Sequence, residues 1–190
     1  AKLDADRRPE GASVTVEKKT KGMLFASATW HFSTEELPAE SRSDLFGVEL
    51  RYFKRVKVGS EVTLVPLAVG GKGATLAVGD EVEVQISLRA KAAAEYVHLR
   101  DPRPAGLEPD RPESGWKWDL GISRYEETRD SGANFFFENL PAGEYTFKYR
   151  LRANLAGEFR SGPAQVQSIY APEFVAYSAG EKLRIDAAPR

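Results

Sequence analysis

The sequence predicts an all-β protein folded as an antiparallel β-sandwich, and three observations lead to this prediction. The clearest is the segment 81–88, in which every second residue is apolar, as in a strand with one buried face. The segment 145–151 alternates in the same way. Glycine and proline turns separate many such short segments, and no helical period is sustained anywhere in the chain.

The expected strands are short and follow one another along the chain. At the start, the alternation is carried by Val14 and Val16 and then by the segment 23–33. Residues 34–42, interrupted by Pro38, read as a loop or a single helical turn, and the alanines at 92–94 as a bulge or a short helical crossing. The remaining expected strands are 48–53, 62–69, 82–88, 96–98, 135–137, 145–151, 164–170 and 182–185.

Three regions depart from a regular strand pattern. Pro66 places the strand at 62–69 on a sheet edge or at a bulge, because proline cannot donate a ladder hydrogen bond. Residues 102–112 contain four prolines, which predicts an extended loop. Residues 114–129 hold two tryptophans and a tyrosine among polar residues, without the alternation of a half-buried strand.

The strand at 145–151 is entered through a corner, Leu140-Pro141-Ala142-Gly143-Glu144, in which proline and glycine supply the turn geometry. Tyr145 follows this corner directly, and this is the position of the tyrosine corner in immunoglobulin-like sandwiches. The sandwich predicted here does not by itself indicate a function.

Length and composition narrow the functional classes. The 190 residues suffice for one large domain or for a domain with an appendage. The 27 basic and 28 acidic side chains leave a net charge of −1, without the basic excess of a nucleic-acid-binding protein. No apolar run approaches the roughly 20 residues that cross a bilayer. Nucleic acid and membrane contact by this segment are therefore not expected.

The residue inventory also argues against an enzyme, a metal site or a bound cofactor. Cysteine is absent, which removes thiol nucleophiles and thiolate metal ligands. The only two histidines, His31 and His98, lie far apart in the sequence and are interpreted as structural. The segment 70–75 superficially suggests phosphate binding, but it lacks the P-loop spacing and reads as a hairpin turn. Glu81 and Glu83 lie on the polar face of one strand, where they are expected to be solvated.

The aromatic residues of the segment 114–129 are the main candidates for a binding surface. Trp116 and Trp118 are flanked by polar residues and glycines. Aromatic side chains on a loop suit a protein interface or carbohydrate stacking. The alternative left open is that they fold back and cap one end of the sandwich.

Several motifs in a fixed order carry a family resemblance. The chain resembles the C-terminal macroglobulin domain of bacterial α2-macroglobulins, and residues 21–30 resemble a returning strand of the domain that flanks the thioester domain in that family. The motifs of the C-terminal domain are YVHLRDPRPAGLEP at 96–109, TRD at 128–130, NFFF at 134–137, LPAG at 140–143 and QSIYAPEF at 167–174.

The resemblance implies a macroglobulin-type β-sandwich with a strand-rich appendage at its N-terminal side. We expect residues 1–13 to be a disordered leader and residues 14–44 to be the returning strands of the flanking domain. Residues 45–190 are then the terminal sandwich.

In that family a target protease cuts a bait region, and a buried Cys-Gln thioester then captures a lysine of the protease. Because this chain has no cysteine, the resemblance implies a non-catalytic terminal module that packs against the thioester domain and shields it. The implied partners are the thioester domain and neighbouring macroglobulin domains of one parent chain, and target proteases through that parent. The implied location is the periplasm, with the parent anchored to the inner membrane.

We expect Trp116, Trp118, Tyr125 and Tyr170 to form the contact with the thioester domain, because aromatic side chains exclude water well. The alternative function is that of a free-standing immunoglobulin-like module for adhesion or carbohydrate binding, which would use the same tryptophans. Binding of soluble glycans would favour this alternative.

Overall fold

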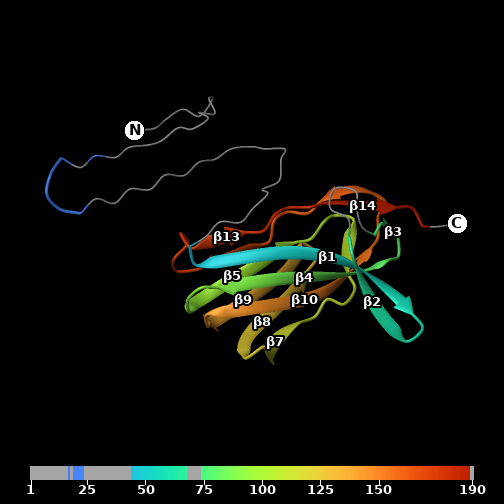
Figure 1. Ribbon diagram of the computed structural model, residues 1–190, viewed down its shortest axis with the longest axis horizontal. Coiled ribbons are helices and arrows are strands. Elements are labelled where there is room, and N and C mark those ends of the chain that lie inside the picture. The colour runs from blue at the N-terminus through green and yellow to red at the C-terminus, as the bar shows by residue number, and fades with distance from the viewer. Residues whose placement is uncertain (1–16, 18, 24–43, 68–73, 189–190) are drawn as a thin grey trace. The chain divides into compact units, whose positions relative to one another are not determined.

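The computed structural model describes residues 17, 19–23, 44–67 and 74–188. The chain divides into two compact units, Ala1–Thr34 and Glu35–Arg190, and the fold below belongs to the second. Every regular element in the described residues is a β-strand, as Figure 1 shows. The all-β prediction is therefore confirmed. Within these residues there is also no helix long and apolar enough to span a membrane.

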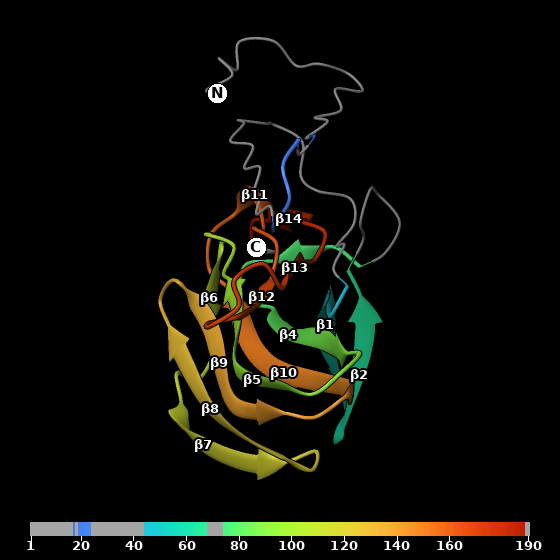
Figure 2. The ribbon, with the colours of Figure 1, turned by 90° about the vertical axis from the view of Figure 1, so that its left-hand side faces the viewer.

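Two sheets form the layers of an antiparallel sandwich, and Figure 2 shows them from the side. One has five strands in the order β2-β1-β4-β10-β6, and the other has six in the order β13-β12-β5-β9-β8-β7. The five-stranded sheet comprises β1 (Phe46–Val58), β2 (Glu61–Pro66), β4 (Glu81–Ala90), β6 (Leu107–Pro109) and β10 (Gly143–Ala153). The six-stranded sheet comprises β5 (Ala94–Pro102), β7 (Ser114–Asp119), β8 (Ile122–Arg129), β9 (Gly132–Leu140), β12 (Gln165–Ser168) and β13 (Val175–Tyr177).

A smaller third sheet has the order β11-β14-β3. It consists of β11 (Gly157–Arg160), β14 (Lys182–Asp186) and the two-residue β3 (Leu76–Ala77). The pairing of β3 with β14 is parallel, whereas all pairings in the two large sheets are antiparallel.

The core fills the space between the two large sheets, and the alternation in β4 and β10 predicts it correctly. The inward apolar side chains of β4 are at most 3% exposed, and Phe147 of β10 is 1% exposed. From the other sheet, Phe135 and Phe137 of β9 place their rings 5.2 and 5.4 Å from the Phe147 ring. These three rings join the sheets through apolar contact.

The tyrosine corner is present at the crossover from one sheet to the other. The chain leaves β9 at Leu140 and enters β10 at Gly143. The Tyr145 hydroxyl donates a 3.0 Å hydrogen bond to the Pro141 carbonyl oxygen. This bond fixes the corner and confirms the interpretation of the 140–145 segment.

Several local predictions were wrong. The segment 114–129 forms two strands, β7 and β8, and the proline-rich segment 102–112 contains the short strand β6. The alanine-rich stretch 92–94 is neither a bulge nor a helical crossing, because Ala92 and Ala93 lie between the end of β4 and the start of β5. Strands β3, β11 and β13 were not expected, and β12 ends at Ser168, before Tyr170.

Some predictions concern residues outside the described part of the chain. These are the strands at Val14–Val16 and 24–33, the segment 34–42, His31 and the turn after Gly70. The division into a leader, an appendage and a terminal sandwich stays a prediction for the same reason.

Candidate interaction surface

The outer face of the six-stranded sheet carries a row of ring side chains that crosses four strands. Strand register places Trp116 of β7 opposite Tyr125 of β8, and Tyr125 opposite Phe136 of β9. Phe136 in turn lies opposite His98 of β5. All four point away from the core, because their sequence neighbours on each strand face inward.

The rings contact one another along this row. The Trp116 and Tyr125 centroids are 5.8 Å apart in an edge-to-face arrangement, and those of Tyr125 and Phe136 are 6.5 Å apart. Phe136 stacks on the His98 imidazole at 4.5 Å with an interplanar angle of 2°. The His98 Nε2 atom lies 3.0 Å from the Asn134 Oδ1 atom in a hydrogen bond, so His98 is a satisfied structural histidine, as expected.

A second pair of rings lies beside this row. Tyr96 precedes His98 by two residues on β5 and is 45% exposed. The ring of Tyr170 contacts the Tyr96 ring edge-on at 5.0 Å. Tyr96 adopts a left-handed backbone conformation (φ 51°), which is uncommon for a residue with a bulky side chain. We call Trp116, Trp118, Tyr125, Phe136, His98, Tyr96 and Tyr170 the aromatic face.

The structure brings together some, but not all, of the four residues expected at the interface. Trp116 and Tyr125 are in ring contact, and Trp118 follows Trp116 at the next outward position of β7. Tyr170 contacts Tyr96 rather than the tryptophans. Trp116, Trp118 and Tyr170 are 56%, 81% and 77% exposed. The alternative in which the tryptophans fold back over one end of the sandwich is therefore wrong.

Three members of the aromatic face were missed by sequence reasoning. Phe136 was grouped with its neighbours as part of a strand, although alternation alone puts it on the opposite face from Phe135 and Phe137. His98 and Tyr96 were recognised only as strand residues. The signal that unites them is the register between strands, which the sequence of one chain does not contain.

A charged cluster on the inner side holds the β7–β8 hairpin in place. Arg124 of β8 is 4% exposed, and its guanidinium lies 4.9 Å from the Phe147 ring centroid. It donates hydrogen bonds to Asp119 and to Glu126, the latter at 2.6 Å. The Lys117 ammonium lies 2.6 Å from the other Glu126 oxygen. The hairpin thus presents aromatic side chains outward and paired charges inward.

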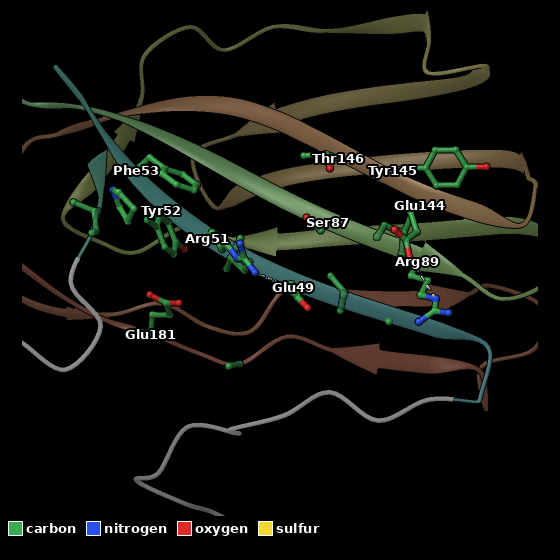
Figure 3. Close-up of a pocket in the computed structure, with 17 residues that line it drawn as sticks. Glu49, Arg51, Tyr52, Phe53, Ser87, Arg89, Glu144, Tyr145, Thr146 and Glu181 are labelled. Carbon is green, nitrogen blue, oxygen red and sulfur yellow. Dashed lines mark hydrogen bonds and ion pairs between the residues drawn. The ribbon is translucent and has the colours of Figure 1, made fainter. Parts of the chain in front are cut away.

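A hollow of the described surface lies over the five-stranded sheet, and Figure 3 shows its lining. Four of its charged residues form exposed ion pairs, with Arg51 3.0 Å from Glu49 and Arg89 3.6 Å from Glu144. Ser87 lies in the lining, but no histidine does. The lining therefore holds no serine–histidine pair of the kind that activates a serine nucleophile.

The acidic residues of β4 do not form a catalytic pair either. Glu83 is 8% exposed and lies 2.7 Å from Arg55, so the expectation that it is solvated was wrong. A hydrogen bond from Lys57 is the main cause that lowers the pKa of Glu81, and a general acid would need a raised pKa. In the described residues, no group of three or more His, Asp or Glu could hold a metal ion.

These observations define an antiparallel macroglobulin-type β-sandwich domain with an exposed aromatic face. The sequence of residues 46–173 matches the family described as the bacterial alpha-2-macroglobulin MG10 domain. This match covers more than half of the chain, so the chain belongs to that family. The resemblance inferred from the motifs is thereby confirmed.

Solved structures agree on the fold. Salmonella alpha-2-macroglobulin reacted with methylamine matches with a TM-score of 0.58 and 20% identity, over 78% of this chain and 10% of that chain. Native alpha-2-macroglobulin from Escherichia coli, from domain MG7 to the C-terminus, matches with a TM-score of 0.58 and 18% identity. That match covers 80% of this chain and 25% of that chain. The chain thus spans a small part of each of these proteins.

One curated protein shares sequence with the chain at a higher identity. The "Circularly permutated Ras protein 2" of Dictyostelium discoideum is 26% identical over 165 residues. The match covers 83% of this chain and 4% of that protein. A segment similar to this domain therefore also occurs in a much longer protein whose name does not refer to macroglobulins.

Proposed function

We propose that the chain is the non-catalytic C-terminal module of a bacterial α2-macroglobulin-type protease trap. In this proposal the trap inhibits endopeptidases broadly, lies in the periplasm and is anchored to the inner membrane through other parts of the parent. The module contributes by packing against the thioester domain and keeping water and amines away from the thioester. Membership in the MG10 domain family supports the proposal.

The single structural observation that carries this proposal is the aromatic face. Soluble domains rarely expose several large aromatic side chains in one contiguous array unless the array contacts a partner. Tryptophan and tyrosine are also the residues that contribute most to interface energy. A thioester survives only where nucleophiles are excluded, and a rigid aromatic surface placed over it serves that purpose.

The test is the reactivity of the parent protein toward methylamine. The amine attacks the thioester carbonyl, forms an amide and releases the cysteine thiol, which a chromogenic disulfide reagent detects. We expect the double variant Trp116→Ala/Tyr125→Ala to release this thiol on the order of tenfold faster, which corresponds to about 1.4 kcal/mol of lost shielding contact.

The matched control is Leu155→Ala, because Leu155 is 55% exposed but lies outside the aromatic face. This variant should release the thiol at the rate of the unaltered parent. Equal rates for the double variant and the unaltered parent would contradict a shielding role. A parent that releases no thiol even after denaturation would contradict the presence of a thioester.

The alternative, a free-standing carbohydrate-binding module, would use the same exposed tryptophans. Trp116 and Trp118 lie on one strand face, where they could stack on sugar rings. Titration with soluble glycans would then change the tryptophan fluorescence of the chain, and Trp116→Ala would reduce this change. Under the protease-trap proposal, glycans leave the fluorescence unchanged.

A further inference from the structure

Asp101 is a carboxyl group buried between the two sheets with a single hydrogen bond. It lies near the end of β5, on the same inward face as Val97 and Leu99, and is 0% exposed. Its Oδ2 atom accepts a 2.6 Å hydrogen bond from the Tyr149 hydroxyl of β10, in the opposite sheet. Its Oδ1 atom is buried and has no hydrogen-bond partner.

The surroundings of Asp101 contain other polar groups but no cation paired with it in the described residues. From β1, Tyr52 contributes a second buried oxygen, and the side chain that interacts with it is that of Ser161. Burial first, and then the negative charge of Asp101, raises the pKa of Tyr52 well above its usual range. From β9, the residues opposite Asp101 and its neighbour Pro102 are Ala133 and Gly132, which do not titrate.

Two further titratable groups lie near this cluster. The Arg103 guanidinium donates hydrogen bonds to carbonyl oxygens, including that of Asp130 at 2.6 Å. Its positive charge acts on the Tyr149 hydroxyl, whose pKa it lowers, but the described residues show no ion pair between Arg103 and Asp101. Glu181 is half-buried, and burial raises its pKa. Backbone and side-chain hydrogen bonds join Glu181 to Ser161, which is fully buried. A buried carboxylate with one donor and no cation is poorly solvated, whereas a neutral carboxyl is tolerated.

We propose that Asp101, Tyr149 and Tyr52 form a protonation-dependent contact between the two sheets. The neutral Asp101 carboxyl stabilises the sandwich, and ionisation of this carboxyl destabilises the sandwich. Burial raises the pKa of the Asp101 carboxyl to about 7, although the Tyr149 hydrogen bond opposes this effect. The contribution of Asp101 therefore stabilises the chain more in mild acid than at neutral pH.

The sign follows from proton linkage. In the unfolded chain Asp101 ionises near its ordinary pKa, whereas in the folded chain it keeps its proton until the pH approaches 7. Between about pH 4 and pH 7 the folded state therefore binds one more proton, and stability falls as the pH rises. Above pH 7 both states are ionised and this contribution is constant. Hydrogen bonds from Lys57 and Arg124 lower the pKa values of Glu81 and Asp119. The stability that these two carboxylates contribute is lost as the pH falls below about 4, so their effect on the pH dependence is opposite to that of Asp101.

The first experiment follows the carboxyl carbon of Asp101 by NMR during a pH titration of the 190-residue chain. We expect a midpoint near neutral pH, and a further upward shift in Tyr149→Phe, which removes the hydrogen bond that favours the carboxylate. A midpoint below pH 5 would overturn the proposal.

The second experiment measures urea unfolding from pH 4 to pH 7. We expect the unfolding equilibrium constant of the unaltered chain to rise by up to about tenfold per pH unit through loss of one proton. Asp101→Asn should lose most of this dependence, because the amide resembles the neutral carboxyl in shape. Glu181→Gln is the matched control and should keep most of it. Equal pH dependence in the unaltered chain and Asp101→Asn would contradict the proposal.

Discussion

Replacing Phe147 with alanine is expected to lower the free energy of unfolding by about 3–5 kcal/mol. Phe147 is 1% exposed and lies between the sheets, with its ring against Phe135, Phe137 and the Arg124 guanidinium. Truncation removes this apolar contact and leaves a cavity that the two surrounding sheets can fill only in part. Phe147 thereby joins the two inward phenylalanines of β9, Phe135 and Phe137, to the opposite sheet.

Urea denaturation of the chain measures this loss as a lower midpoint with an unchanged slope. The matched control is Thr146→Ala, because Thr146 precedes Phe147 on β10 but is exposed on the outer face. We expect the control to change the free energy of unfolding by less than about 0.5 kcal/mol. A loss below about 1 kcal/mol for Phe147→Ala would show that this ring does not join the sheets.

Replacing Arg124 with alanine is expected to cost about 3 kcal/mol, at the lower end of the range for breaking a buried ion pair. Burial opposes the charged form of Arg124, but the hydrogen bonds to Asp119 and Glu126 more than offset this, so its pKa is raised. The substitution leaves Glu126, which is 9% exposed, with Lys117 as its remaining ion-pair partner. It also removes the cation above the Phe147 ring.

The measurement combines urea denaturation with amide hydrogen exchange. Arg124 anchors the hairpin from its inner side. The Arg124→Ala substitution should therefore accelerate amide exchange in β7 and β8 more than it does in β4. The control is Arg129→Ala, whose ion pair with Glu127 at 2.5 Å involves an arginine side chain that is 67% exposed. Exposed pairs contribute little, so no measurable change is expected. An equal response of the two variants would contradict the anchoring role.

The main strands were predictable because their alternation separates apolar from polar side chains cleanly. In β4, Val82, Val84 and Ile86 are 0% exposed, as a strand with one buried face requires. The corner before β10 was predictable for a different reason, since proline and glycine specify the turn and a tyrosine follows it.

The β7–β8 hairpin was not predictable, because its polarity is reversed relative to an ordinary strand. Trp116, Trp118 and Tyr125 point outward, whereas the charged side chains of Lys117, Arg124 and Glu126 point inward. Alternation detects a buried apolar face, and here the inward face carries an ion-pair cluster. The segment therefore resembled a loop in the sequence.

The aromatic face was predictable only in part, for a geometric reason. Composition singled out the tryptophans, but the contacts between Tyr125, Phe136 and His98 depend on how three strands are aligned. A shift of the β9 pairing register by one residue would point Phe136 into the core and expose Phe135 and Phe137 instead. The buried position of Asp101 could have been inferred, because it continues the inward alternation of Val97 and Leu99.

The most direct test of the proposed packing of the aromatic face is hydroxyl-radical footprinting of Trp116 and Trp118 in the 190-residue chain and in the parent polypeptide. Both side chains are exposed in this domain, so both should be oxidised readily in the isolated chain. If the aromatic face packs against a neighbouring domain, their oxidation falls several-fold in the parent, whereas Leu155 outside the face reacts equally in both. Equal oxidation of the two tryptophans in the chain and in the parent would contradict the proposed packing.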